Sequence, residues 1–133
     1  AEGLITRLSA YSVDTTMDRF EVAVEKRGLK IFARLDHAAA AKSVDLAMPP
    51  ATVIVFGNPR LGTPNFIKTP TLAIDLPLKA IVWDDGKGQV FLSYNSAEYL
   101  YSTIYVRHGI PYNKAAVAPF ENALKAIADE ALR

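Results

Sequence analysis

The stretch ATVIVFGNPRLGTP, residues 51–64, constrains the fold more than any other part of the chain. Its first half contains a continuous apolar run, Val53 to Phe56, which predicts a strand covered on both faces. The run stops at Gly-Asn-Pro and is followed by Gly-Thr-Pro, a pattern that predicts a constrained loop. A rigid strand that ends in such a loop is a common setting for binding residues.

Length and composition limit the possible classes of protein. The chain has 133 residues, enough for one hydrophobic core, so we expect a single domain over residues 1–133. Its 15 basic and 14 acidic residues nearly cancel, which argues against a nucleic-acid partner. No apolar run reaches the roughly 20 residues of a membrane span. The absence of cysteine excludes thiol nucleophiles, disulfides and zinc–thiolate sites, and we expect no cofactor.

The first residues bear on localisation. The chain starts with Ala-Glu-Gly rather than Met, as chains do after a signal peptidase has cut. A trimmed chain of any origin would start in the same way. The lack of cysteine fits an oxidising compartment, so we expect a periplasmic or secreted protein.

Four helices are expected where apolar residues recur three or four positions apart. The first begins at Ser12 or Asp14, either of which can cap it, and ends at Gly28. A short alanine-rich helix covers residues 37–44, and a tyrosine-rich helix follows Ser96. The last helix holds Pro119 in its first turn and buries one apolar face, formed by Val117, Phe120, Leu124, Ile127 and Ala131.

The other periodic segments predict strands. Residues 29–36 alternate, which predicts that Ile31, Ala33 and Leu35 share one buried face. The turn DDGKG joins two further apolar segments into a hairpin. The expected strands are residues 4–10, 29–36, 53–56, 78–83 and 89–95. This order predicts the α+β class: a single domain with one mixed or antiparallel sheet of about five strands and helices packed against it.

Asp36 and His37 are the first candidate site residues. A histidine beside a carboxylate can act as an acid, a base or a metal ligand, because its pKa lies near neutrality. The alternative is that Asp36 caps the following helix and His37 only occupies its first turn. His108 is a weak second metal candidate, although a histidine at a helix end is also favoured by the backbone dipole.

The segment Gly57 to Thr63 is the second candidate site. Its glycine spacing resembles a phosphate-binding loop, but no lysine follows the second glycine, which disfavours nucleotide hydrolysis. Asn58 and Thr63 can still offer hydrogen bonds to a small polar or anionic ligand, and Arg60 or Lys42 can offer the complementary charge. Alternatively, these residues only form turns.

A carboxylate and a set of tyrosines complete the candidates. Asp75 lies among apolar residues and needs a cation or solvent. It can orient His37 or pair with Arg34, Lys42 or Arg60. The tyrosines can line a pocket or a subunit contact, or belong to the core. They are Tyr94, Tyr99, Tyr101 and Tyr105.

Several of these motifs, in this order, resemble the bacterial and archaeal domain-of-unknown-function family 302. The resemblance rests on EKRGLKIFARLDHAAAAK at 25–42, VFGNPRLGTP, PTLAIDLPLKAIVWDDGKGQVFLSYN at 70–95 and RHGI at 107–110. After Tyr94-Asn95 the family typically has Asp-Pro, whereas this chain has Ser96-Ala97, and a serine can take over only helix capping. The resemblance implies a fold and a frequently exported form, but no reaction.

Three functions are compatible with these patterns. The first is an exported, homodimeric domain that binds a small polar or anionic molecule at the Gly57–Thr63 segment, with His37 and Asp75 nearby. The second is an enzyme in which His37 is the general base, oriented by Asp36 or Asp75. The third is a protein-interaction module that acts through Tyr101, Tyr105 and the last helix.

Overall fold

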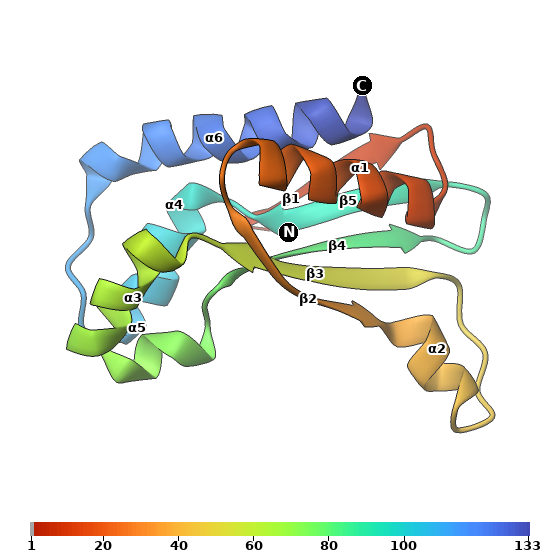
Figure 1. Cartoon of the computed structure of the whole chain (residues 1–133), viewed down its shortest axis with the longest axis horizontal. Coiled ribbons are helices and arrows are strands. Elements are labelled where there is room, and N and C mark those ends of the chain that lie inside the picture. The colour runs from red at the N-terminus through yellow and green to blue at the C-terminus, as the bar shows by residue number, and fades with distance from the viewer. Residues whose placement is uncertain (1) are drawn as a thin grey trace.

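Five strands form one antiparallel sheet in the order β1-β5-β4-β3-β2 (Figure 1). The computed structural model describes residues 2–133, so Ala1 of the expected processed terminus lies outside it. The strands are β1 (Leu4–Ser9), β2 (Lys30–Asp36), β3 (Ala51–Gly57), β4 (Leu78–Asp84) and β5 (Val90–Asn95). The sheet and its helices confirm the predicted α+β fold with five strands.

Two long helices, α1 (Val13–Lys26) and α6 (Lys114–Leu132), pack side by side on one face of the sheet (Figure 1). The Ser12 side chain caps α1 by accepting a hydrogen bond from the Thr15 N–H. Both helices point their apolar stripes at the sheet, so the core lies between the two layers. Its largest fully buried side chains include Met17, Ile54, Phe56, Val82, Leu92 and Ile127.

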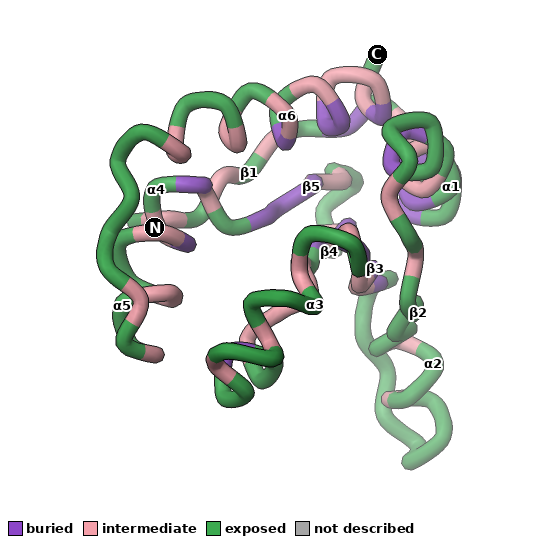
Figure 2. Tube along the Cα trace, turned by 60° about the vertical axis from the view of Figure 1, so that its left-hand side comes forward, coloured by how far each residue is buried: buried purple, intermediate pink, exposed green. Residues whose placement is uncertain are grey.

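The shorter helices lie at the ends of the strands. In both views, α2 (His37–Lys42) and α3 (Pro59–Lys68) lie on the side of the sheet away from α6 (Figures 1 and 2). The remaining short elements are η1 (Pro70–Ile74), α4 (Ala97–Tyr99), η2 (Leu100–Ile104, a π-helical turn) and α5 (Tyr105–Arg107). Within residues 2–133, no helix is both long and apolar enough to cross a membrane.

Strand β3 is covered on one face only, which corrects the prediction made from its apolar run. Ile54 and Phe56 are fully buried against α1 and α6. Val53 and Val55 point to the opposite face and are only half-buried. Alternation along a strand therefore places half of this apolar run on a face that no long helix covers.

A bulge in β2 corrects a second prediction, that Ile31, Ala33 and Leu35 share a face. The register shifts between Ile31 and Ala33, so that Ile31 pairs with Phe56 of the core face. After the shift Leu35 pairs with Val53, which points to the opposite face. Because the bulge adds one residue to β2, Ala33 and Leu35 point to the sheet face opposite the one that Ile31 faces.

The segment GNPRLGTP folds into the start of a helix rather than a loop. The Asn58 side chain caps α3 by accepting a hydrogen bond from the Arg60 N–H at 3.0 Å. Pro59 takes the first helical position, where its missing N–H costs nothing. Pro64 lies inside α3, and Pro119 lies in the second turn of α6 rather than its first turn, because that helix already begins at Lys114.

We predict that Leu92→Ala lowers the free energy of unfolding by about 2–5 kcal/mol, because Leu92 is fully buried between sheet and helices. Chemical denaturation measures this change. Ile67→Ala is the matched control: Ile67 is 76% exposed on α3, so its loss should change stability by less than about 0.5 kcal/mol. Equal effects of the two substitutions would contradict the assignment of the core.

Candidate functional site

Asp75 and His108 form a close contact at one end of the sheet. His108 Nε2 lies 2.5 Å from Asp75 Oδ2, although the two residues are 33 positions apart in the chain. Asp75 directly follows η1, and His108 directly follows α5. The His108 side chain is 6% exposed and the Asp75 side chain 23% exposed, so the contact is largely shielded from water.

Thr71 occupies the other nitrogen of the same imidazole. Its hydroxyl lies 2.9 Å from His108 Nδ1. Because Nε2 faces a carboxylate, it carries a hydrogen; Nδ1 then accepts from the Thr71 hydroxyl in the neutral ring and donates to it in the charged ring. Thr71 lies in η1 and Asp75 directly follows it, so the ring joins η1 to the end of α5.

Two further cations surround Asp75. Arg107 Nε lies 3.6 Å from its carboxylate, and the Lys79 ammonium lies 3.4 Å from its backbone carbonyl oxygen. The hydrogen bond from His108 lowers the pKa of Asp75 below its ordinary value, and the positive charge of Arg107 adds to this effect. Partial burial opposes the change without reversing it. Asp75 is thus held as a carboxylate.

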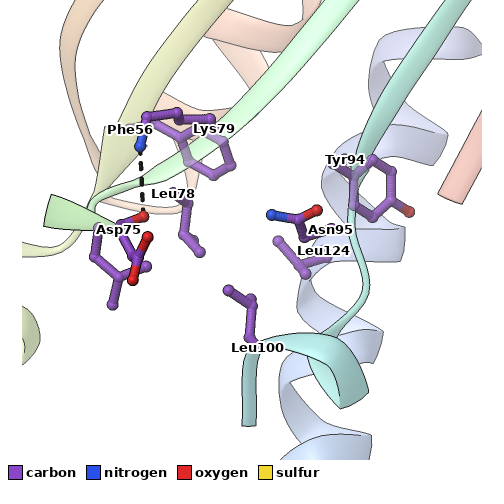
Figure 3. A pocket seen from close by; sticks show the side chains of 9 residues that line it. Phe56, Asp75, Leu78, Lys79, Tyr94, Asn95, Leu100 and Leu124 are labelled. Carbon is purple, nitrogen blue, oxygen red and sulfur yellow. Dashed lines mark hydrogen bonds between the residues drawn. The ribbon is translucent and has the colours of Figure 1, made fainter. Parts of the chain in front are cut away.

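Asp75 also lines a small pocket of about 50 Å³ (Figure 3). Apolar side chains from the strands, α6 and η2 form its wall, and polar groups stand at its rim. In Figure 3 a dashed line joins the Lys79 ammonium to Asp75. The lining residues are Phe56, Leu76, Leu78, Tyr94, Leu100 and Leu124, with Asp75, Lys79 and Asn95 as polar members.

His37 lies far from this pocket. The β2–β3 register places Asp36 opposite Thr52 and Lys30 opposite Gly57. His37 therefore lies at one end of β3 and Asn58 at the other, separated by seven residues of strand, or about 20 Å. The expected grouping of His37 with the Gly57–Thr63 segment is wrong. His37 follows the end of β2 that lies beside the start of β3, whereas the Gly57–Thr63 segment follows the end of β3.

The structure favours the capping interpretation of Asp36. Its Oδ1 accepts the Ala39 N–H at 2.9 Å, and His37 is exposed in the first turn of α2. His37 shares this helix with Lys42, which is exposed as well. His37 and His108 lie at opposite ends of the sheet, and residues 2–133 contain no cluster of three His, Asp or Glu side chains suited to a metal ion.

Of the ligand-binding residues predicted from the sequence, Asp75 lines the pocket. Asn58 is used as a helix cap, and Arg60 and Thr63 lie exposed on α3. Sequence reasoning did not connect Asp75 with His108, and it did not select Thr71, Lys79 or Asn95. The spacing of Thr71 and Asp75, four apart as on one helical turn, is the one local feature that indicates a shared partner.

The tyrosine-rich segment packs inside the chain. The Tyr101 ring lies 4.9 Å from the Tyr105 ring and 5.9 Å from the Phe120 ring of α6. Both tyrosines are half-buried, and burial raises the pKa of each phenol. The Ser96 side chain accepts the Tyr99 N–H at 3.1 Å, the capping role expected for it. These contacts join the segment to α6.

A family model and a solved structure both match almost the whole chain. The model of the domain of unknown function DUF302 matches residues 5–131. The crystal structure of an uncharacterized conserved DUF302 protein from Bacillus stearothermophilus is similar over 100% of both chains, with a TM-score of 0.81 and 18% identity. At that identity the likeness concerns the fold alone.

Curated relatives resemble part of the chain at higher identity. A protein of Brucella suis named fluoride-specific ion channel FluC 1 is 40% identical over 98 residues, as is FluC 1 of Brucella abortus. The match covers 74% of this chain but only 39% and 36% of those proteins. The chain therefore spans well under half the length of the curated relatives it matches.

We predict that Asp75→Asn destabilises the fold by about 1 kcal/mol near pH 6, because it removes a charged partner of His108. Since the folded-state pKa of Asp75 is lowered, this stabilisation is complete above the ordinary aspartate pKa of about 3.9 and is lost as pH falls through the folded-state value. The difference between wild type and variant should therefore shrink below about pH 4. Denaturation series between pH 2 and 6 measure it.

Asp45→Asn is the control for this series. Asp45 is exposed in the turn after α2, and Asn tolerates its positive φ of 61° as Asp does. It should change stability by less than about 0.5 kcal/mol at every pH. A wild type and an Asp75→Asn variant of equal stability at pH 6 would show that the contact with His108 does not hold the two segments together.

Proposed function

The chain belongs to the family of domain of unknown function DUF302, and we propose that it binds a small anionic or polar ligand at the pocket beside Asp75. The sequence already predicted a ligand of this class and already included Asp75. In place of Asn58, Arg60 and Thr63, which follow β3, the proposed site contains Lys79 and Asn95, which line the pocket.

The proposal rests on one observation, that Lys79 lines the pocket without a carboxylate partner in the part of the chain that the structure describes. Lys79 lines the pocket, and its ammonium forms no ion pair with any carboxylate among residues 2–133. The Asp75 carboxylate already forms an ion pair with Arg107 and a hydrogen bond with His108. The rim therefore has a net positive charge, and an anion beside it gains Coulomb energy.

The size and the wall of the pocket limit the ligand further. A cavity of about 50 Å³ holds only a few water-sized groups. Its inner wall includes Phe56, Leu100 and Leu124, which favour a short apolar part. The best match is a small anion of the size of acetate, with its charge towards Lys79 and Asn95. The fluoride channels among the relatives suggest fluoride as a second anion to test.

The hydrogen-bonded chain Thr71–His108–Asp75 favours a second candidate, an enzyme. Asp75 binds His108 at Nε2, which leaves the other ring nitrogen, Nδ1, able to accept a proton from a hydroxyl group. The Thr71 hydroxyl lies next to that nitrogen. In this candidate His108 replaces His37 as the general base. Export and a homodimeric state stay predictions for either function.

We predict saturable amide shifts at Asp75, Lys79 and Asn95 when sodium acetate or sodium fluoride is added to ¹⁵N-labelled protein, with sodium chloride keeping the ionic strength constant. Lys79→Ala should weaken binding at least about tenfold, the effect of losing one charged hydrogen bond worth about 1.5 kcal/mol or more. NMR titration of both proteins measures the affinities.

Arg60→Ala is the matched control, because Arg60 is an exposed cation on α3 and does not line the pocket. It should leave the affinity unchanged. Loss of binding in Arg60→Ala but not in Lys79→Ala would move the site to the start of α3, as the sequence first predicted. The absence of saturable shifts with both anions would contradict the proposal.

A further inference from the structure

The sheet face opposite α1 and α6, here called the open face, has an apolar centre. Strand register aligns its side chains in rows that cross the sheet. One row consists of Leu35, Val53, Ile81, Ser93 and Thr6, and the next of Ala51, Trp83, Phe91 and Leu8. Neither row contains a charged side chain.

The described part of the chain covers this face incompletely. Val53, Ile81, Trp83 and Phe91 are only half-buried, and Leu8 is 59% exposed. Figures 1 and 2 show α1 and α6 on the other face, with α2 and α3 beyond the two ends of the strands. Such a broad apolar surface is unusual for an isolated monomer and typical of an interface.

We propose that a second copy of this chain covers the open face, with the two sheets packed face to face about a twofold axis. This inference goes beyond the proposed function, although the open face borders the ligand pocket at Lys79 and Asn95. It also accounts for the apolar run of β3, whose pattern is typical of a strand covered on both faces.

The absence of charge in the two central rows favours a second copy. In a twofold interface each patch meets itself, so any charge at the centre would face a like charge. The rows contain only apolar, hydroxyl and indole side chains, and the Trp83 N–H already donates to the Ser93 hydroxyl at 3.0 Å. The two central rows can therefore meet their copies without burying an unpaired charge or donor.

The area of the open face can be compared with that of a dimer interface. Five strands about 4.8 Å apart and six or seven residues long give a face of roughly 20 by 20 Å in projection. This projected area is about half of the ~800 Å² per partner of a standard interface, and the side chains that stand on the face add accessible surface to it. Sheets that pack in this way lie about 10 Å apart.

The segment after α2 extends the apolar surface. Val44, Leu46 and Met48 alternate along it and are 65%, 66% and 42% exposed. In both views α2 and this segment project beyond the end of β2, away from α6 (Figures 1 and 2). Their exposed apolar side chains border the sheet at that end.

Sedimentation velocity on the wild type and two lysine variants tests the proposal. We expect the wild type to sediment as a dimer with a fitted mass of about 29 kDa, twice the 14.5 kDa of one chain. Ile81→Lys, at the centre of the face, should sediment as a 14.5 kDa monomer. Val22→Lys, at a 51% exposed position on α1, should remain dimeric. A monomeric wild type would overturn the proposal, as would a dimer that survives Ile81→Lys.

The single tryptophan provides a second test that needs no variant. Trp83 lies in the proposed interface, so acrylamide should quench its fluorescence weakly in the dimer. Dilution below the dissociation constant should increase quenching several-fold and shift the emission to longer wavelength. Unchanged quenching across a dilution series that dissociates the dimer would place the interface elsewhere. A monomer at every concentration would assign the open face to a different protein.

Discussion

Burial of one sheet face beneath α1 and α6 is the interaction on which the rest of the structure depends. Ile54, Phe56, Val82 and Leu92 have no exposed side-chain surface to speak of, and the two helices that cover them also pack on each other. Because β3 and β4 are central in this layer, their ends are fixed in space. Everything that the chain places at those ends, α2 at one and η1 at the other, takes its position from this core.

The contact between Asp75 and His108 organises the end of the sheet where the pocket lies. It joins η1, which lies in the connection from β3 to β4, to α5, which lies in the connection from β5 to α6. Two connections that are distant in the sequence therefore meet there. Because Asp75 pairs with Arg107 and bonds to His108, Lys79 keeps a positive charge that is available to a ligand. An interaction that stabilises the fold thereby also determines the charge of the pocket rim.

The pocket and the open face are adjacent rather than separate. Lys79 and Asn95 line the pocket, and their register positions beside Val55 and Leu4 place them in the row of the open face nearest to it. A partner on the open face would lie against this rim and limit access of water to it. Shielding of this kind strengthens the attraction between an ammonium group and a bound anion.

The sequence by itself determined the order and type of most elements, because these depend on neighbours within a few positions. Ser12, Asp36 and Ser96 cap helices as expected, since each accepts an N–H three residues ahead. Only the tertiary structure decided that Asp75 meets His108 rather than His37, because that depends on which strand ends the sheet brings together. It also decided, through one bulge in β2, which residues the open face displays. A pattern within one strand shows that a side chain is apolar, but the packing of the whole chain determines whether its own helices cover it.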